Sequence, residues 1–521
     1  MFGKAYYFLL VLSLFLNLNA RNLTFKERRL SSQDSEVLVI QTQDFPSEHT
    51  TYVISAKCDA QGRVIRIPKN SNLVFKGDGC IMNAKMEFNG TWLDNPCFKS
   101  TLSYQGAIKN REINLVDFGT RDDTDLFHFV FSQMRNSTIV RFESRKYEID
   151  ALKYHTGRID DDCFVEFRNK KDITIEGNGA EIFDSASSNV LYGALFSVFS
   201  FNHCSRVLIK ELSYTWTDEP MIHPEVRGMI FIRTLNQCDS FQIDVNVSSC
   251  GRGIYSGKWN NYVGHPGRGL CDSKIIVHAN KVGYPIAIEK GDNLMINVFF
   301  DIAHRGVYLA GVTNAKVHVE GKDAYSTQVN LLLTDTMDAD GWYFCDNIDA
   351  TVIDKGTVLS DRVFMAFCQV YSMDYEQFRG RSPYNVRNLM FHLFTPEGTN
   401  TSYELLNIKD MAGIGDSINA VVDGEFHHDG KNDRLYRINL QPKGTVVFNN
   451  VKCHNNTIAY SGNLPDGCNL VFNDCPNIYF EWGAQQVSST GIIEFHGCTF
   501  KTQLKKIPSV KNGHYVKVVN D

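Results

Sequence analysis

The sequence has few prolines, no excess of positive charge and no repeated long apolar runs. Its 521 residues include 13 prolines against 38 glycines, a balance that suits short strands joined by tight turns. The net charge of −6 argues against a general binder of the phosphate backbone, which needs clustered lysine and arginine. We therefore expect no nucleic-acid partner.

An apolar run long enough to cross a membrane is missing after the start of the chain. At the start, Lys4 precedes a run from Tyr6 to Leu16, and the small Ala20 follows it. The run is short for a membrane span, so the pattern predicts a secretory signal peptide over residues 1–20, with an anchoring helix as the alternative. The mature chain is then expected to have no transmembrane segment and to be secreted, periplasmic or at the cell surface.

CxxC pairs and Cys/His clusters with zinc spacing are also missing, so the sequence predicts no metal site of that kind. Calcium is a possible cofactor, although the sequence contains no recognisable ligand motif for it. Export would favour disulfides among the 14 cysteines, and their pairing stays open. Cys204, Cys238 and Cys271 recur at spacings of 34 and 33, each before a polar corner. That placement is typical of small apolar residues stacked in a repeat.

A 3.6-residue apolar period is absent, and polar corners repeat instead. The stretches CDSFQIDV, CDSKIIVHA, GDNLMINV, VTNAKVHV and CDNIDATV place their corners at residues 239, 272, 292, 313 and 346, with steps of 33, 20, 21 and 33. Short alternating strands between such corners cannot bury their apolar face alone, so neighbouring units must stack. The repeat predicts an all-β, parallel β-helix. Leucine-rich repeats have a similar period, but their leucine consensus is missing.

The C-terminal part repeats aromatic residues. Phe448, Phe472 and Phe495 follow one another at steps of 24 and 23, which predicts further coils with stacked rings inside. For residues 376–440 the sequence is compatible with two structures, further coils of the solenoid or a lateral insertion.

Three stretches carry a family resemblance. LVDFGTRDDTDLFHFVF (Leu115 to Phe131), followed by TIVRFESRKYEI and DITIEGNGAEIF, resembles the opening of the pectate-lyase-like superfamily of right-handed parallel β-helices. Glu143-Ser144-Arg145 stands where that family usually has Pro-x-Gly. The preceding segment, GRVIRIPKNSNLVFKGDGCIMNAKMEFNGTWL, is similar to a small β-rich segment in secreted proteins of gut Bacteroidetes. The resemblance implies a right-handed solenoid with a small N-terminal β-rich segment.

These observations divide the chain into four parts. We expect the signal peptide at residues 1–20, the N-terminal β-rich segment at 21–114, the β-helix core at 115–375, and C-terminal coils with an insertion at 376–521.

The pectin-hydrolysing signatures of the family, an Asn-Thr-Asp-Gly stretch, an adjacent Asp pair and a Gly-His-Gly turn, are absent. The acidic strand and arginine of calcium-dependent pectate lyases are not recognisable either. Instead, GIYSG, PIAIEKG and GVYLAG fall on successive coils. Strand alternation turns one set of side chains inward and another outward. The inward set is Ile254, Ile286 and Val307; the outward set is Tyr255, Ala287 and Tyr308, with Glu289 beside Tyr308 and Lys290 at the corner.

Two catalytic mechanisms fit this face. In glycoside hydrolysis, Glu289 pairs with one of Asp335, Asp338 or Asp340 as acid and base or nucleophile. In β-elimination, Lys290, His304 or Arg305 neutralises a uronate or takes the proton beside its carboxylate, and Tyr255 or Tyr308 serves as the acid. The predicted catalytic residues are therefore Glu289, Lys290, His304, Arg305, Tyr308, Asp335 and Asp338.

Two long loops, Lys258 to Leu270 and Asp335 to Phe344, flank this face, and loops of that size commonly wall a groove. The predicted substrate-binding residues are Tyr255, Trp259, His265, Trp342, His223 and Arg227. The expected partner is a polysaccharide or glycan. A secreted hydrolase is preferred over a lyase because acidic residues outnumber basic ones around the proposed groove. The alternative is a non-catalytic glycan-binding or adhesive β-helix, whose outward face would bind sugar without turnover. A separate, purely structural interpretation is that Glu289 and Lys290 form a solvated charge group with Arg305. A phage-type tailspike is disfavoured because no trimerising coiled coil is visible.

Overall fold

The structure is a computed structural model of the 521-residue chain. It describes residues 36–39, 45, 47–155, 162–187, 195–216, 229–257, 269–334, 336–338, 341–343, 345–356, 362–369, 387–397, 403–409, 417–427, 439–440, 443–454, 459–460, 468–480, 492–500 and 515–519.

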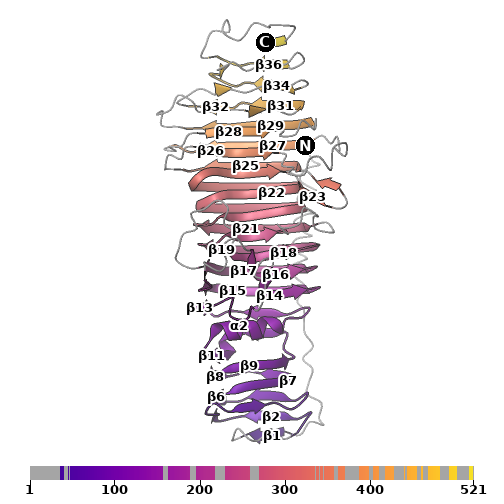
Figure 1. The fold of residues 1–521 in the computed structure, drawn as a ribbon, viewed down its shortest axis with the longest axis vertical. Coiled ribbons are helices and arrows are strands. Elements are labelled where there is room, and N and C mark those ends of the chain that lie inside the picture. Colours follow the sequence, from indigo (N-terminus) through magenta and orange to yellow (C-terminus); the bar gives the residue numbers. More distant parts are fainter. Residues whose placement is uncertain are drawn as a thin grey trace, which may run out of the picture.

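The chain winds into an elongated stack of parallel strands (Figure 1). Its largest sheet has 23 strands, and a strand typically pairs in parallel with the equivalent strand one coil later, as β17 does with β15 and β19. The predicted all-β parallel β-helix is therefore confirmed. The strands of this sheet are β10 (Glu112–Asn114), β12 (Ile139–Arg141), β13 (Lys146–Ile149), β14 (Asp162–Arg168), β15 (Lys171–Asp184), β16 (Phe196–Asn202), β17 (Ser205–Trp216), β18 (Met229–Leu235), β19 (Cys238–Ser248), β20 (Arg252–Ser256), β21 (Leu270–Asn280), β22 (Tyr284–Thr334), β25 (Asp346–Asp354), β26 (Arg362–Gln369), β27 (Arg387–Thr395), β28 (Tyr403–Lys409), β29 (Ser417–Phe426), β30 (Asn439–Leu440), β31 (Lys443–Asn449), β32 (Lys452–Cys453), β34 (Cys468–Asn473), β36 (Ile492–His496) and β37 (Tyr515–Val519).

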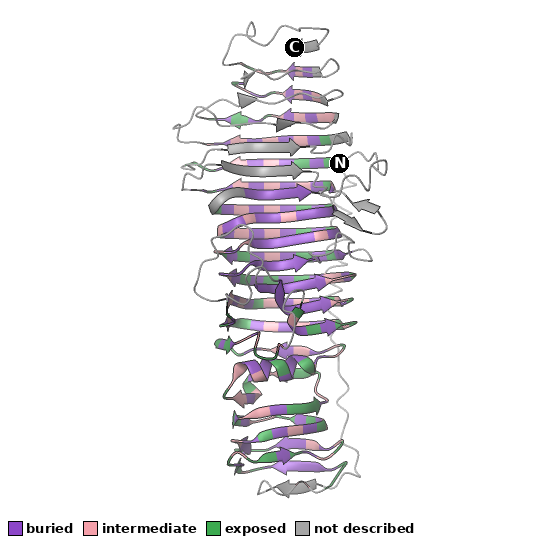
Figure 2. Ribbon diagram, viewed as in Figure 1, coloured by how far each residue is buried: buried purple, intermediate pink, exposed green. Residues whose placement is uncertain are grey.

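The core runs through the middle of the coils, where buried and more exposed residues alternate along many strands (Figure 2). Ile254, Ile286 and Val307 all belong to this core, which confirms their predicted inward orientation. Each such aliphatic side chain contributes about 2 kcal/mol when it leaves water. Consecutive coils therefore hold one another together.

The polar corners are left-handed turns. Ser240, Asn293, Asn314 and Asn347 have φ between 53° and 59°, a region in which asparagine and aspartate are tolerated better than most residues. Their side chains also bond between coils, as when Asn314 Nδ2 donates to Asp292 Oδ1 at 2.7 Å. The corner composition is thus explained by backbone conformation and by an amide ladder.

One predicted corner is displaced by a residue. Asp239 pairs with Cys271, and Cys271 pairs with Asp292, so the coil steps there are 32 and 21 rather than 33 and 20. The cause is that Asp272, with φ 49°, takes the left-handed position. Cys238 consequently lies opposite Leu270, and the predicted stacking of Cys271 with Cys238 is wrong.

Cys204 and Cys238 are buried, and their thiols donate to the carbonyls of Phe167 at 3.2 Å and Phe201 at 3.5 Å. They behave as the small core residues expected of a repeat. No disulfide joins any of the twelve cysteines whose side chains the structure describes.

The N-terminal segment is also built of parallel strand pairs, stacked at one end of the molecule (Figure 1). Its elements are β1 (Glu36–Val39), β2 (Thr51–Ile54), β3 (Lys57–Asp59), β4 (Val64–Arg66), β5 (Asn72–Phe75), β6 (Cys80–Met82), β7 (Lys85–Asp94), β8 (Phe98–Thr101), β9 (Ser103–Ile108), the 3-10 helix η1 (Leu115–Asp117), β11 (Phe118–Thr120) and the helix α2 (Asp123–Ser132).

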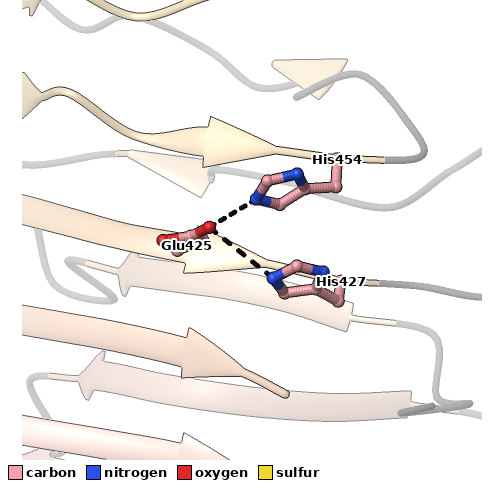
Figure 3. A group of neighbouring side chains, drawn as sticks. All are labelled: Glu425, His427 and His454. Carbon is pink, nitrogen blue, oxygen red and sulfur yellow. Dashed lines mark hydrogen bonds and ion pairs between the residues drawn. The ribbon is translucent and has the colours of Figure 1, made fainter. Parts of the chain in front are cut away.

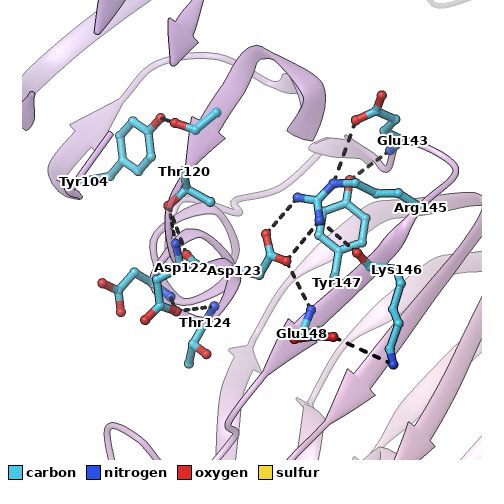
Figure 4. A network of polar contacts seen from close by, with 12 residues as sticks. Tyr104, Thr120, Asp122, Asp123, Thr124, Glu143, Arg145, Lys146, Tyr147 and Glu148 are labelled. Carbon is cyan, nitrogen blue, oxygen red and sulfur yellow. Dashed lines mark hydrogen bonds and ion pairs between the residues drawn. The ribbon is translucent and has the colours of Figure 1, made fainter. Parts of the chain in front are cut away.

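Helix α2 lies between this segment and the long sheet. Asp122 caps its N-terminus by accepting from Thr124 N at 2.8 Å and Asp125 N at 3.2 Å (Figure 4), as N-cap aspartates do. Arg145 donates to both carboxylate oxygens of Asp123, at 2.7 and 3.0 Å, and its guanidinium lies 3.6 Å from the centre of the Tyr147 ring. Arg145, which lies directly before β13, therefore ties the helix to that strand.

The C-terminal coils stack aromatic rings as predicted. Phe472 lies between Phe448 and Phe495, with ring centres 4.8 and 5.2 Å apart. Within residues 376–440, β27, β28 and β29 pair in parallel with the preceding coils, so these strands are coils. Two small sheets complete the fold: β23 (Thr336–Asp338) with β24 (Gly341–Tyr343), and β33 (Ala459–Tyr460) with β35 (Tyr479–Phe480).

Candidate functional site

A second apolar cluster lies apart from the core, on β18, β20, β22 and the residue before β16. We call it the outer-face cluster; its members are Leu195, Ile230, Tyr255, Tyr284 and Ala287, with Tyr308 packed against them. The predicted outward orientation of Tyr255, Ala287 and Tyr308 is confirmed. Because the outside of a solenoid is normally polar, a buried aromatic group there needs an explanation of its own.

Arginine side chains lie among these rings. Parallel register places Arg252 between Ile230 and Tyr284 on neighbouring coils. The Arg252 guanidinium carbon lies 4.6 Å from the Tyr255 ring centre and 5.4 Å from that of Tyr284, and Arg305 lies 5.5 Å from the latter. These distances are within the range of cation–π attraction. The rings therefore hold two guanidinium groups in place.

Arg233 lies beside Tyr255 in the same register. It is 1% exposed, and its Nε and Nη2 donate to the carbonyl of Gly257 at 3.2 and 3.1 Å. Buried arginine is rare unless it has partners of this kind. Its guanidinium is thereby fixed beneath the outer face.

Glu289 meets Tyr255 at the centre of the face. The Tyr255 hydroxyl donates to Glu289 Oε1 at 2.9 Å, and Gly257 allows this approach, because a Cβ there would lie 2.6 Å from Glu289 Oε2. Burial raises the pKa of Tyr255 well above its usual value, and the neighbouring Glu289 carboxylate adds to the shift. Tyr255 is therefore a proton donor at neutral pH, and Glu289 is an acceptor.

Several of the other predicted residues also lie on β22. The rings of His304 and Tyr308 are roughly perpendicular to that of Tyr284, with centres 6.0 and 6.3 Å away. Lys290 is 7% exposed and takes a left-handed corner with φ 66°. Glu289, Arg305 and Tyr308 are half-buried, so the face has a buried floor and a rim that reaches solvent.

The other predicted residues are not placed by side chain. Trp259, His265, His223, Arg227 and Asp335 lie outside the described residues. Asp338 and Trp342 are described by backbone only, in the antiparallel pair of β23 and β24. The predicted carboxylate partner of Glu289 thus lies outside the side chains described.

The described side chains in and beside the cluster include one carboxylate, Glu289, and four basic groups, Arg233, Arg252, Lys290 and Arg305. The acidic loop on which the preference for hydrolysis depended, Asp335 to Asp340, lies outside the described side chains, so that preference stays a prediction.

Sequence reasoning missed Arg233, Arg252 and Tyr284. They lie in the stretches FIRTL, GRGIY and GYPIA. Strand alternation would have found Arg233, because it pairs with the outward Tyr255 on the next coil. Arg252 and Tyr284 are each two residues before an inward isoleucine, Ile254 and Ile286, so alternation alone turns them inward and could not have found them.

No family model matches the chain, and no curated protein matches it. Among solved structures, the surface protein and adhesin PfbA of Streptococcus pneumoniae aligns over 90% of this chain and 91% of its own, with 9% identity and a TM-score of 0.27. A likeness this distant carries no functional argument. The class of protein, a parallel β-helix, is defined by the strand pairing itself.

The described residues include no helix that is long and apolar enough to cross a membrane. The predicted signal peptide, residues 1–20, lies outside them.

Proposed function

We propose that the protein is a secreted or surface-exposed β-helix that binds an acidic glycan at the outer-face cluster without cleaving it. The observation that carries the proposal is the pair of guanidinium groups, Arg252 and Arg305, held against the Tyr284 ring on the outside of the solenoid. The half-buried Tyr308 ring can cover the face of a sugar ring at the rim, and the half-buried Arg305 can bind its carboxylate or sulfate.

The chemistry of the cluster favours an anionic ligand. Arginine binds carboxylate and sulfate-like groups through paired, charge-assisted hydrogen bonds, and its preorganised plane loses little freedom on binding. A single carboxylate, Glu289, faces these cations within the described side chains, and it already accepts from Tyr255. The floor is buried while the rim is half-buried, so a chain of sugars would lie along the rim with its acidic groups pointing inward.

The test is a binding panel of acidic polysaccharides, each paired with a neutral counterpart, measured by calorimetry at two salt concentrations. We expect binding to the acidic member only, weakened by salt because the contacts are partly solvated. R252Q and R305Q should each weaken it about tenfold or more, the effect of losing a charge-assisted contact. The matched control is R206Q, whose arginine pairs with Asp172 at 2.6 Å on the solenoid surface. Equal binding of neutral glycans, or an equal loss in R206Q, contradicts the proposal.

β-Elimination of a uronate polymer is the second candidate. The specific observation is that Tyr308, His304 and Arg305, a hydroxyl, an imidazole and a guanidinium, surround one ring, that of Tyr284. These are the groups that would neutralise a uronate and move a proton. Incubating the same panel and following both new reducing ends and the absorbance of unsaturated uronates separates the outcomes. Absorbance would establish a lyase, reducing ends alone a hydrolase, and binding without either would support the first proposal.

A further inference from the structure

A separate group of side chains lies near the C-terminal end of the solenoid. Glu425 and His427 come from the end of β29 and the residue after it, and His454 follows β32 on the next coil (Figure 3). One potential ligand atom from each lies within 4.8 Å of the others, and among the residues that the structure describes this is the only such group of three.

Parallel register brings the two histidines together. Phe426 pairs with Cys453, and His454 N donates to Phe426 O at 3.0 Å, so His427 and His454 occupy equivalent positions on consecutive coils. Their rings stack with centres 4.0 Å apart at 11°. The backbone of His427 is fixed in addition by Thr395, whose hydroxyl accepts from His427 N at 2.9 Å and donates to its carbonyl at 3.0 Å.

Both rings turn the same nitrogen toward one carboxylate. His454 Nε2 is hydrogen-bonded to Glu425 Oε1, and His427 Nε2 lies 3.6 Å from the same oxygen (Figure 3). A neighbouring histidine shows a different arrangement: His392 uses its two nitrogens on two carboxylates, Asp423 at 2.7 Å and Asp349 at 3.3 Å. An imidazolium between two acids is an ordinary ion pair, whereas two imidazoles converging on one acid form a ligand set.

We propose that Glu425, His427 and His454 bind a divalent transition-metal ion, with zinc as the natural occupant. Two imidazoles and one carboxylate are donors that zinc accepts at about 2.0–2.2 Å in a tetrahedron, whereas calcium and magnesium prefer oxygen alone. Tetrahedral ligands at that length lie roughly 3.4 Å apart, so modest rotation of these side chains closes the site. All three are partly exposed, by 30 to 44%, and water completes the coordination.

The ion would crosslink two consecutive coils. It would join β29 to the coil that ends at β32. Because it binds the folded coils, it would stabilise them by an amount that grows with the logarithm of its concentration over its dissociation constant. The sequence offered a weak signal, since EFHHD and KCHNN become neighbours only if the coil step of 27 residues between Glu425 and Lys452 is known.

The full-length chain, stripped with chelator and desalted, is titrated with zinc chloride by calorimetry, and with cobalt chloride by visible absorption. We expect about one equivalent of zinc and the absorption of tetrahedral cobalt. H427Q and H454Q should each weaken zinc binding by about 100-fold or more, since even second-shell changes cost about 10–100-fold, and H392Q should leave it unchanged. E425Q serves as the third variant if either histidine variant fails to fold, as judged by circular dichroism. Absence of zinc binding, or binding equally strong in H427Q, H454Q and E425Q, overturns the proposal.

Discussion

Gly257 leaves room for the contact between Tyr255 and Glu289 on the outer face. A methyl group there would lie 2.6 Å from Glu289 Oε2 and 2.8 Å from Tyr255 Cζ, and contacts that short force neighbouring groups to move. We expect G257A to lower the free energy of unfolding by about 1–3 kcal/mol. A double-mutant cycle checks the cause: in an E289A background the carboxylate contact is gone, so the cost of G257A should shrink by about 1 kcal/mol. Strict additivity would show that Glu289 is not the group displaced.

Asp184 is a second residue whose setting has a measurable consequence. It is fully buried, accepts from Ala151 N, Ala186 N and the Tyr214 hydroxyl, and burial raises its pKa to about 6. The folded state therefore holds this proton more tightly than the unfolded state does. The protonated carboxyl is favourable below about pH 4, and that contribution is lost as the pH rises toward 6.

The prediction concerns D184N, whose amide stays neutral at every pH. Between pH 4 and 7, the stability of the native protein relative to D184N should fall by about 2 kcal/mol. Amide hydrogen exchange of the peptides around residues 184–186 measures it locally. A difference that is constant with pH would mean that the Asp184 carboxyl titrates near its ordinary value.

At the scale of elements, helix α2 depends on one arginine. Arg145 binds both oxygens of Asp123 and stacks on Tyr147, so R145A removes a bidentate ion pair and a cation–π contact together. We expect a loss of about 1–2 kcal/mol, seen as faster amide exchange in α2. The matched control is R66A, whose arginine is 75% exposed beside Glu87 and should cost under about 1 kcal/mol. Equal effects of the two variants would contradict this prediction and show that Arg145 contributes no more than an ordinary surface charge.

The same scale shows what the sequence can and cannot predict. Strand alternation predicted that Tyr255 and Tyr308 face outward and that Ile254 and Ile286 face inward. Successive side chains of a strand point to opposite faces, so the orientation of one residue fixes that of its neighbours. The corner predicted at Asp272-Ser273 was misplaced by one residue. Either Asp272 or Ser273 could take the left-handed position, and only the backbone conformation shows that Asp272 does. Neighbours from different coils, such as Arg252 with Tyr284, depend on register between strands many residues apart. A sequence pattern fixes that register only to within a residue.

At the scale of the molecule, a solenoid is a stack in which each coil contacts mainly its neighbours, so damage should stay local. Phe472 is nearly inaccessible and lies between the rings of Phe448 and Phe495. F472A should cost about 3–5 kcal/mol, the usual loss for a buried phenylalanine. Because β31, β34 and β36 pair only along the stack, that cost should appear as faster hydrogen exchange in these strands.

The distant coils provide the control within the same experiment. β15, β17 and β19 contribute aliphatic residues to the same continuous core but are many coils away, so their exchange in F472A should match the native protein. Uniformly faster exchange along the chain would mean that the whole solenoid unfolds as one unit, with interfaces between coils strong enough to spread the loss. Local loss would instead mean that the C-terminal coils open independently. In that case, an ion bound at Glu425, His427 and His454 would act where the stack is weakest, and zinc should slow exchange in β29 and β32 while leaving β17 unchanged.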